Sequence, residues 1–202
     1  MSMEAWTYLF GRRSRALCAW LLLLVTLAAG CGGSLYRVKP VIEVPAAEKG
    51  GSATAGGINL RAAPLLSDEE SQELFESNLP LAGLLAVRVE LTNSSGAPIE
   101  FKRLRFRLRD GEGRAWKARS AKEAASRILE ANAVMLYNPQ ARKSFEEALS
   151  RQTLDLKTPL AAAERRRGLI FFQTPKKEAI EGPRNLVLTL EGLEQPLELP
   201  LN

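Results

Sequence analysis

The sequence of 202 residues predicts a mainly β protein of the α+β class, a small antiparallel β-sandwich with about three short helices. Segments of alternating apolar and polar residues occupy both ends of the predicted domain. Two capped segments with helical spacing lie between them, and Gly- and Asn-containing turns separate the strands. We expect one domain over residues 58–202, with a helical insertion at about 120–150.

The clearest strand signal is the strict alternation over residues 85–92. A second strand is expected over 99–109, where the apolar residues change parity, so we expect a β-bulge near Lys102 and Arg103. Later strands are expected around Trp116 and over residues 169–173, 186–190 and 197–201. The predicted turns are Asn93–Gly96, Asp110–Gly113 and Glu191-Gly192.

Capping residues predict where the helices begin. Ser67 with Glu70, and Ser120 with Glu123, are capping boxes, and Asn138-Pro139 is a cap followed by a first-turn proline. The expected buried faces hold Leu74 and Phe75, then Ala121, Ala124, Ala125, Ile128 and Leu129, then Phe145, Ala148 and Leu149. Trp116, Phe145, Phe171 and Phe172 are expected in the core; an exposed aromatic groove for a peptide or glycan is the alternative.

Three segments together resemble a known family. Residues 85–93 form a strand that ends at an asparagine turn, residues 106–113 form a strand that ends in Asp-x-x-Gly, and residues 168–172 begin with glycine and aromatics. This set is similar to uncharacterised bacterial lipoproteins with immunoglobulin-like β-sandwich domains, over about half of the mature chain. The resemblance implies that fold and an extracytoplasmic setting, and it brings no catalytic residues. The helical segment 120–150 departs from the family's shortest members.

The N-terminal segment is typical of a lipoprotein signal peptide. Basic residues at 12–15 precede an apolar run over 16–29, which is shorter than the roughly 20 residues of a membrane-spanning helix. Leu27-Ala28-Ala29-Gly30-Cys31 resembles a lipobox, which implies removal of residues 1–30 and lipid on Cys31. An ordinary secretory signal with a chance cysteine, or an uncleaved anchor, is the alternative.

The residues after Cys31 predict how the domain is held. Residues 31–57 are rich in Gly, Ala, Ser and Pro and are expected to form a flexible tether, although 36–44 could be a first strand. Position 32 is glycine rather than aspartate. By the sorting rule of enteric bacteria, this favours the outer membrane, with the protein facing the periplasm.

Composition excludes several kinds of chemistry. The chain has no histidine, which removes the commonest general base and metal ligand. Of its two cysteines, Cys18 lies in the segment expected to be removed, so no disulfide can form within the mature chain. The net charge is +5, and the +3 that remains after the expected removal of residues 1–30 is too small to indicate nucleic acid. No dinucleotide or phosphate motif occurs. We therefore predict no catalytic residues, no metal and no cofactor.

The candidate site is a stripe of arginines at every second position. Guanidinium groups spaced this way on one strand face could bind phosphates of lipid headgroups or lipopolysaccharide, or an acidic partner. A solvated face neutralised by Glu90 or Glu100 is the alternative. The stripe consists of Arg103, Arg105, Arg107 and Arg109.

Other charged runs are weaker candidates. Arg165-Arg166-Arg167 could extend the basic surface or be the solvated start of a strand, and Lys176-Lys177 has the same two interpretations. Glu69, Glu73 and Glu76 share one helix face. A catalytic acid pair needs a buried carboxylate, so a solvated helix face is favoured there.

These observations predict a non-catalytic binding or assembly module of the bacterial cell envelope, anchored to the membrane through Cys31 and bound to an envelope protein. The alternative is an accessory lipoprotein that carries lipid or glycan, and a hydrolase that uses only carboxylates ranks third. A deep apolar cavity would favour transport, and a flat apolar patch would favour a protein partner. Two close, buried carboxylates would favour the enzyme.

Overall fold

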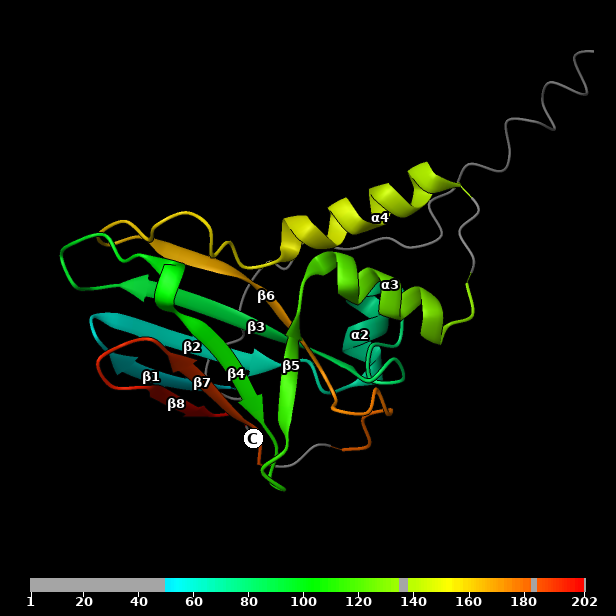
Figure 1. Ribbon diagram of the computed structural model, residues 1–202, viewed down its shortest axis with the longest axis horizontal. Helices are drawn as coiled ribbons and strands as arrows, with labels where there is room; N and C mark the ends of the chain where they lie inside the picture. Colours follow the sequence, from blue (N-terminus) through cyan, green and yellow to red (C-terminus); the bar gives the residue numbers. More distant parts are fainter. Residues whose placement is uncertain (1–49, 135–137, 183–184, 202) are drawn as a thin grey trace, which may run out of the picture. The chain divides into compact units, whose positions relative to one another are not determined.

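The computed structural model describes residues 50–134, 138–182 and 185–201. In chain order the elements are β1 (Gly51–Ala55), β2 (Ile58–Pro64), α2 (Asp68–Phe75), β3 (Leu84–Asn93), the 3₁₀ helix η2 (Phe101–Arg103), β4 (Arg105–Arg109), β5 (Ala115–Arg119), α3 (Ala121–Ala131), α4 (Pro139–Gln152), β6 (Arg165–Gln173), β7 (Val187–Glu191) and β8 (Leu197–Pro200) (Figure 1). The prediction of a mainly antiparallel β protein with helices is confirmed.

Within the described residues the strands form one eight-stranded sheet in the order β1-β2-β3-β6-β5-β4-β7-β8, and every neighbouring pair is antiparallel. β5 joins the half β1-β2-β3-β6 to the half β4-β7-β8. The two edge strands approach each other closely, because a Cβ added to Gly51 of β1 would lie 2.5 Å from the carbonyl oxygen of Pro200 in β8. The sheet therefore curls until it is nearly a barrel.

The alternation along the strands divides the apolar side chains between two cores. On β3, Leu85, Val87 and Val89 point into the larger core, which the curled sheet encloses together with Leu108, Leu188 and other residues of the second half. Leu84 and Ala86 lie on the opposite face and belong to a second core with the helices. There the rings of Phe75 and Phe171 meet edge to face, with centroids 6.1 Å apart.

The aromatic residues predicted to be core are all buried, and this prediction is confirmed. Trp116 and Phe172 belong to the core inside the sheet, and Phe145 and Phe171 to the core under the helices. Figure 1 shows α2, α3 and α4 grouped together beside the sheet. The helices therefore extend the hydrophobic interior onto the outer face of β3 and β6.

The predicted helix caps are present. The Ser67 hydroxyl accepts from the backbone N–H of Glu70 at 3.1 Å, so Ser67 is an N-cap. The Glu70 carboxylate accepts from Arg88 Nη1 instead of completing the predicted capping box, whereas Ser120 and Glu123 bond reciprocally as predicted. Asn138 accepts from Gln140 N–H, with Pro139 as the first helical residue. Local sequence therefore determines where α2, α3 and α4 begin.

The expected β-bulge near Lys102 is wrong. The apolar parity changes because the chain makes the 3₁₀ turn η2, which buries Phe101 and then Leu104 on the same side. Gly192 packs against this turn: a Cβ there would lie 2.1 Å from the carbonyl oxygen of Arg103. The 3₁₀ turn, rather than one extra residue inserted into a strand, therefore changes which positions of the chain point into the core.

The sheet also begins earlier than expected. β1 pairs along its length with β2, so the predicted start of the domain at Ile58 falls inside a β-hairpin and residues 51–55 are not part of a tether. The expected signal peptide, Cys31 and residues up to 49 lie outside the described residues. Within the described residues, no helix is both long and apolar enough to cross a membrane.

Candidate functional site

The structure brings three of the four predicted stripe arginines together. Arg105, Arg107 and Arg109 lie exposed on one face of β4, whereas Arg103 belongs to η2. Arg107 Nε donates to Glu191 Oε2 at 2.6 Å. Arg105 Nη1 donates to backbone carbonyls, including that of Leu104 at 2.7 Å. Two of the guanidinium groups are therefore already engaged.

Glu90, one of the two carboxylates expected to neutralise this stripe, instead neutralises other arginines. It lies opposite Arg61 of β2 and Arg167 of β6 in the strand registers. Glu90 Oε2 lies 2.5 Å from Arg167 Nε, and Oε1 lies 3.6 Å from Arg61 Nη1 and 3.7 Å from Arg165 Nε. We call these four residues the Glu90 cluster. The Glu90 carboxylate is 4% exposed. Because three guanidiniums surround this one carboxylate, the face of β2, β3 and β6 that carries the Glu90 cluster has a net positive charge.

The run Arg165-Arg166-Arg167 is divided between the two faces of β6. Arg165 and Arg167 belong to the Glu90 cluster, but Arg166 is largely buried and pairs with Glu164 at 2.7 Å. Arg166 also donates to the carbonyl of Thr158 and lies 5.4 Å from the Phe101 ring centroid. The interpretation of the whole run as a solvated stretch is therefore wrong for Arg166, which holds the loop before β6 against the core.

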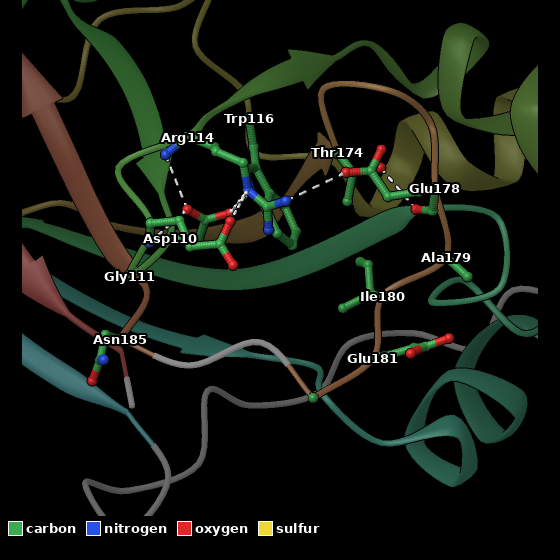
Figure 2. A pocket seen from close by; sticks show the side chains of 12 residues that line it. Asp110, Gly111, Arg114, Trp116, Thr174, Glu178, Ala179, Ile180, Glu181 and Asn185 are labelled. Atoms are coloured by element: carbon green, nitrogen blue, oxygen red, sulfur yellow. Dashed lines mark hydrogen bonds and ion pairs between the residues drawn. The ribbon is translucent and has the colours of Figure 1, made fainter.

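The described part of the chain contains an open cavity of about 660 Å³, at the turn between β4 and β5 (Figure 2). Asp110, Arg114 and Trp116 line it on one side, and residues between Thr174 and Gly182 contribute Glu178 and Glu181 on the other. We call it the Asp110 pocket. Its wall is built by the predicted turn Asp110–Gly113, which is confirmed: Gly113 N–H donates to the Asp110 carbonyl at 2.9 Å.

The Asp110 carboxylate is fixed by four donors. Oδ1 accepts from the backbone N–H groups of Glu112 and Arg114 at 3.1 and 3.0 Å. Oδ2 accepts from Arg114 Nε at 2.8 Å and from the indole Nε1 of Trp116 at 2.9 Å. Burial alone would raise the pKa of Asp110, but the hydrogen bonds from Trp116 and Arg114 outweigh it and leave the pKa below its ordinary value. Asp110 therefore stays ionised at neutral pH.

The charges around the Asp110 pocket are mostly negative. Four carboxylates line it, those of Asp110, Glu112, Glu178 and Glu181, against the single guanidinium of Arg114. Arg114 lies 3.3 Å from Glu112 and 4.0 Å from Glu178. Hydrogen bonds from its own N–H and from Lys176 N–H lower the pKa of Glu178. The pocket therefore presents a fixed negative field to solvent, which favours a cationic group.

Sequence reasoning missed this pocket. It identified Asp110–Gly113 as a turn, but it did not assign the carboxylate a role, and the segment after β6 gave no signal beyond Pro175 and the lysines. A usable signal was present locally: Arg114 and Trp116 are donors that follow Asp110 at short range. The opposing carboxylates at 178 and 181 come from far along the chain and had no such signal.

The side chains of the remaining predicted candidates do not line the Asp110 pocket. Glu69, Glu73 and Glu76 are exposed on and just after α2, and Lys176 and Lys177 are exposed in the loop after β6. Among the described residues, no three Asp, Glu, Cys or His side chains are grouped so that they could hold a metal ion.

No protein-family model and no curated protein matches the sequence. A solved structure of a conserved hypothetical protein from Bacillus anthracis matches with a TM-score of 0.38 and 13% identity, over 73% of this chain and 90% of that one. At that TM-score the likeness adds nothing to the function. The relationship to immunoglobulin-like lipoproteins stays a prediction.

Proposed function

We propose that this protein is a non-catalytic binding module of the bacterial cell envelope, and that the Asp110 pocket receives a basic segment of an envelope protein. One observation carries the proposal: an open cavity of about 660 Å³ is lined by four carboxylates and one arginine. The buried Asp110 network holds one wall rigid, so little ordering is needed when a lysine or arginine side chain enters.

The state of the carboxylates supports binding over acid catalysis. A general acid at neutral pH needs a raised pKa, as a carboxyl group acquires in an apolar site. The pKa values of Asp110 and Glu178 are instead lowered by hydrogen bonds. Both groups remain anionic and act on a ligand through charge.

The lining also favours a polar partner over a lipid. A lipid carrier encloses an apolar cavity, whereas five of the twelve residues that line this open one are charged. Most large apolar side chains of the described residues are packed into the two cores, where Leu108 and Phe171 are fully buried, although Leu66 and Leu81 are exposed. Transport of lipid or glycan is therefore the alternative proposal, and a lipid that co-purifies with the protein would favour it.

Anchoring and location rest on the sequence. The lipobox-like residues 27–31 support cleavage before Cys31 and acylation of its sulfur, and Gly32 supports the outer membrane. Tethering would raise the concentration of the pocket near other envelope proteins. The immunoglobulin-like class is part of the same proposal: the two halves of the sheet face one core as sandwich layers do, although β5 joins them.

The test is cross-linking in cells, followed by mass spectrometry of the proteins that co-purify. We expect a recurrent envelope partner whose recovery falls at least about tenfold in Glu178→Gln/Glu181→Gln, because two charges facing it are removed. The matched control is Glu147→Gln/Glu198→Gln, which removes two exposed carboxylates outside the pocket. Equal loss in both double variants, or in neither, would contradict the assignment of the site.

Cys31→Ala separates the site from the anchor in the same experiment. We expect this variant to move from the membrane to the soluble fraction and to lose the partner in cells. It should retain salt-sensitive binding to the purified partner, since the pocket is intact. Continued tight membrane association of Cys31→Ala would contradict lipid anchoring and leave the pocket assignment standing.

A further inference from the structure

A second cavity is lined by Gln173, a residue that carries a buried donor without an acceptor. Its volume is about 290 Å³, and it lies along one flank of α3, where Gln173 ends β6. Gln173 is 3% exposed, and its Nε2 has no hydrogen-bond partner within the described part of the chain. We call this cavity the Gln173 pocket. An unsatisfied buried amide donor costs about 1–3 kcal/mol, so an acceptor placed there would be stabilising.

The amide orientation follows from its neighbour. Arg119 Nε donates to Gln173 Oε1 at 2.8 Å, and Arg119 Nη1 donates to Glu123 Oε1 at 2.9 Å. The reversed amide would place an NH₂ group against the guanidinium, donor against donor. Nε2 is therefore the atom left without an acceptor.

Hydrogen bonds from Arg127 hold two segments near the Gln173 pocket together. Arg127 Nε donates to the Ala82 carbonyl at 2.8 Å, and Arg127 Nη2 donates to the Lys177 carbonyl at 3.0 Å. Lys177 has a φ of +62°, a conformation that costs a non-glycine residue energy. Arg127 thus holds the loop after β6 against the turn before β3. Lys177, the strained residue of this loop, is thereby kept at the pocket.

The charge of the Gln173 pocket selects the kind of acceptor. Arg119, Lys122, Arg127 and Lys177 line it against only two carboxylates, so its net charge is positive. Both arginines are paired within the wall, with Glu123 and Glu130. In the part of the chain that the structure describes, neither lysine ammonium has an ion-pair partner. The lysines therefore supply the uncompensated charge, which favours an anion over a neutral carbonyl group.

We propose that the Gln173 pocket binds a small oxyanion, one oxygen of which accepts from Gln173 Nε2 while Lys122 and Lys177 neutralise its charge. The volume suits a group the size of one amino-acid residue or a phosphate. Because Nε2 is covered, a neighbouring side chain must move aside to admit the ligand. The two lysine side chains are exposed and can move without breaking an ion pair to any residue that the structure describes.

Two sources share this chemistry, a carboxylate and inorganic phosphate, and NMR can separate them. We would label the full-length chain with ¹⁵N in detergent micelles and titrate it with sodium acetate, sodium phosphate and, for ionic strength, sodium chloride. The Gln173 side-chain amide is assigned by its absence in Gln173→Glu. We expect a saturable shift of this amide with acetate or with phosphate, which identifies the source, and none with chloride.

Variants test the geometry of the Gln173 pocket. Gln173→Glu keeps an acceptor for Arg119 but replaces the donor with a negative oxygen, so the saturable shifts of neighbouring backbone amides should weaken at least about tenfold. Lys177→Gly keeps the positive φ and removes a charge, so it should weaken binding several-fold. Lys143→Gln, on the exposed face of α4, is the matched control and should change nothing. If neither anion produced saturable shifts, or if binding were unchanged in Gln173→Glu, the proposal would be overturned.

Discussion

Asp110 and Glu90 are both buried carboxylates held by arginine, but their partners differ in origin. Asp110 accepts from two backbone N–H groups, an indole and one guanidinium, all within six residues along the chain. Among the described residues, the Glu90 carboxylate is held by guanidiniums alone, from β2 and from both outward positions at the start of β6. One carboxylate shapes a turn, and the other connects three neighbouring strands.

This difference determines the charge that each region presents. The backbone and indole donors of Asp110 are neutral, so its negative charge adds to that of the three glutamates around the pocket. The charge of Glu90 is exceeded by its three arginines, so the surface around it is positive. Two similar side chains, buried to a similar extent, therefore produce local fields of opposite sign. The donors, rather than the carboxylate, decide which ligands each region favours.

The largest expected effect is that of Asp110→Asn. The replacement removes the charge and places an amide donor against Trp116 or Arg114, which leaves buried donors unsatisfied. We expect the free energy of unfolding to fall by about 3 kcal/mol, measured by urea denaturation at pH 7. Asp68→Asn, at an exposed position of α2, is the control and should change it by less than about 1 kcal/mol.

The pH dependence gives a second measurement on Asp110→Asn. The folded-state pKa of Asp110 is lowered, so its contribution to stability is present above its unfolded pKa of about 3.9 and is lost as pH falls through the lower folded value. The difference between wild type and Asp110→Asn should therefore be constant from pH 7 to about pH 5 and shrink below about pH 4. A difference that stays constant down to pH 3 would contradict the ionised network.

A smaller effect is expected for Glu90→Gln. The three arginines lose their carboxylate, but their side chains are 37–58% exposed and remain hydrated. We expect a loss of about 1–2 kcal/mol in urea denaturation, reduced in high salt because salt screens the repulsion among the arginines. Glu198→Gln, exposed on β8, should have no effect. If Glu90→Gln lowered the free energy of unfolding as much as Asp110→Asn does, the difference expected between a carboxylate held mostly by neutral donors and one held by arginines would be contradicted.

The same two carboxylates show how far the sequence could predict this molecule. Strand alternation and capping residues predicted β3, α3 and α4, because those signals lie within a few residues of the structure they determine. The Asp110–Gly113 turn is local in the same way. The partners of Glu90 depend on which strands become neighbours and in which register, and no single segment contains that information.

The Asp110 pocket and the Gln173 pocket illustrate the same limit of prediction from sequence. Each joins a predicted element, the β4–β5 turn or α3, to the segment after β6, whose path is fixed by tertiary contacts. Gly83 is one such contact, since a Cβ there would lie 2.5 Å from the carbonyl oxygen of Glu178. The change of parity before β4 was visible in the sequence, but whether a bulge or η2 produced it depended on packing against Gly192.

The smallest effect on stability is expected for substitutions in the arginine stripe, because its guanidinium groups are exposed to solvent. Arg107 and Glu191 form an exposed pair at 2.6 Å, and such pairs are screened by solvent. Arg105→Glu/Arg107→Glu should therefore leave the urea midpoint nearly unchanged. If the stripe binds phosphates, the same variant should weaken binding to anionic liposomes, with the largest difference at low salt. Glu90 and its arginines are unaltered in this variant, so equal liposome binding by both proteins would exclude the stripe and leave the Glu90 cluster and the Gln173 pocket as the basic surfaces that could bind anionic lipid.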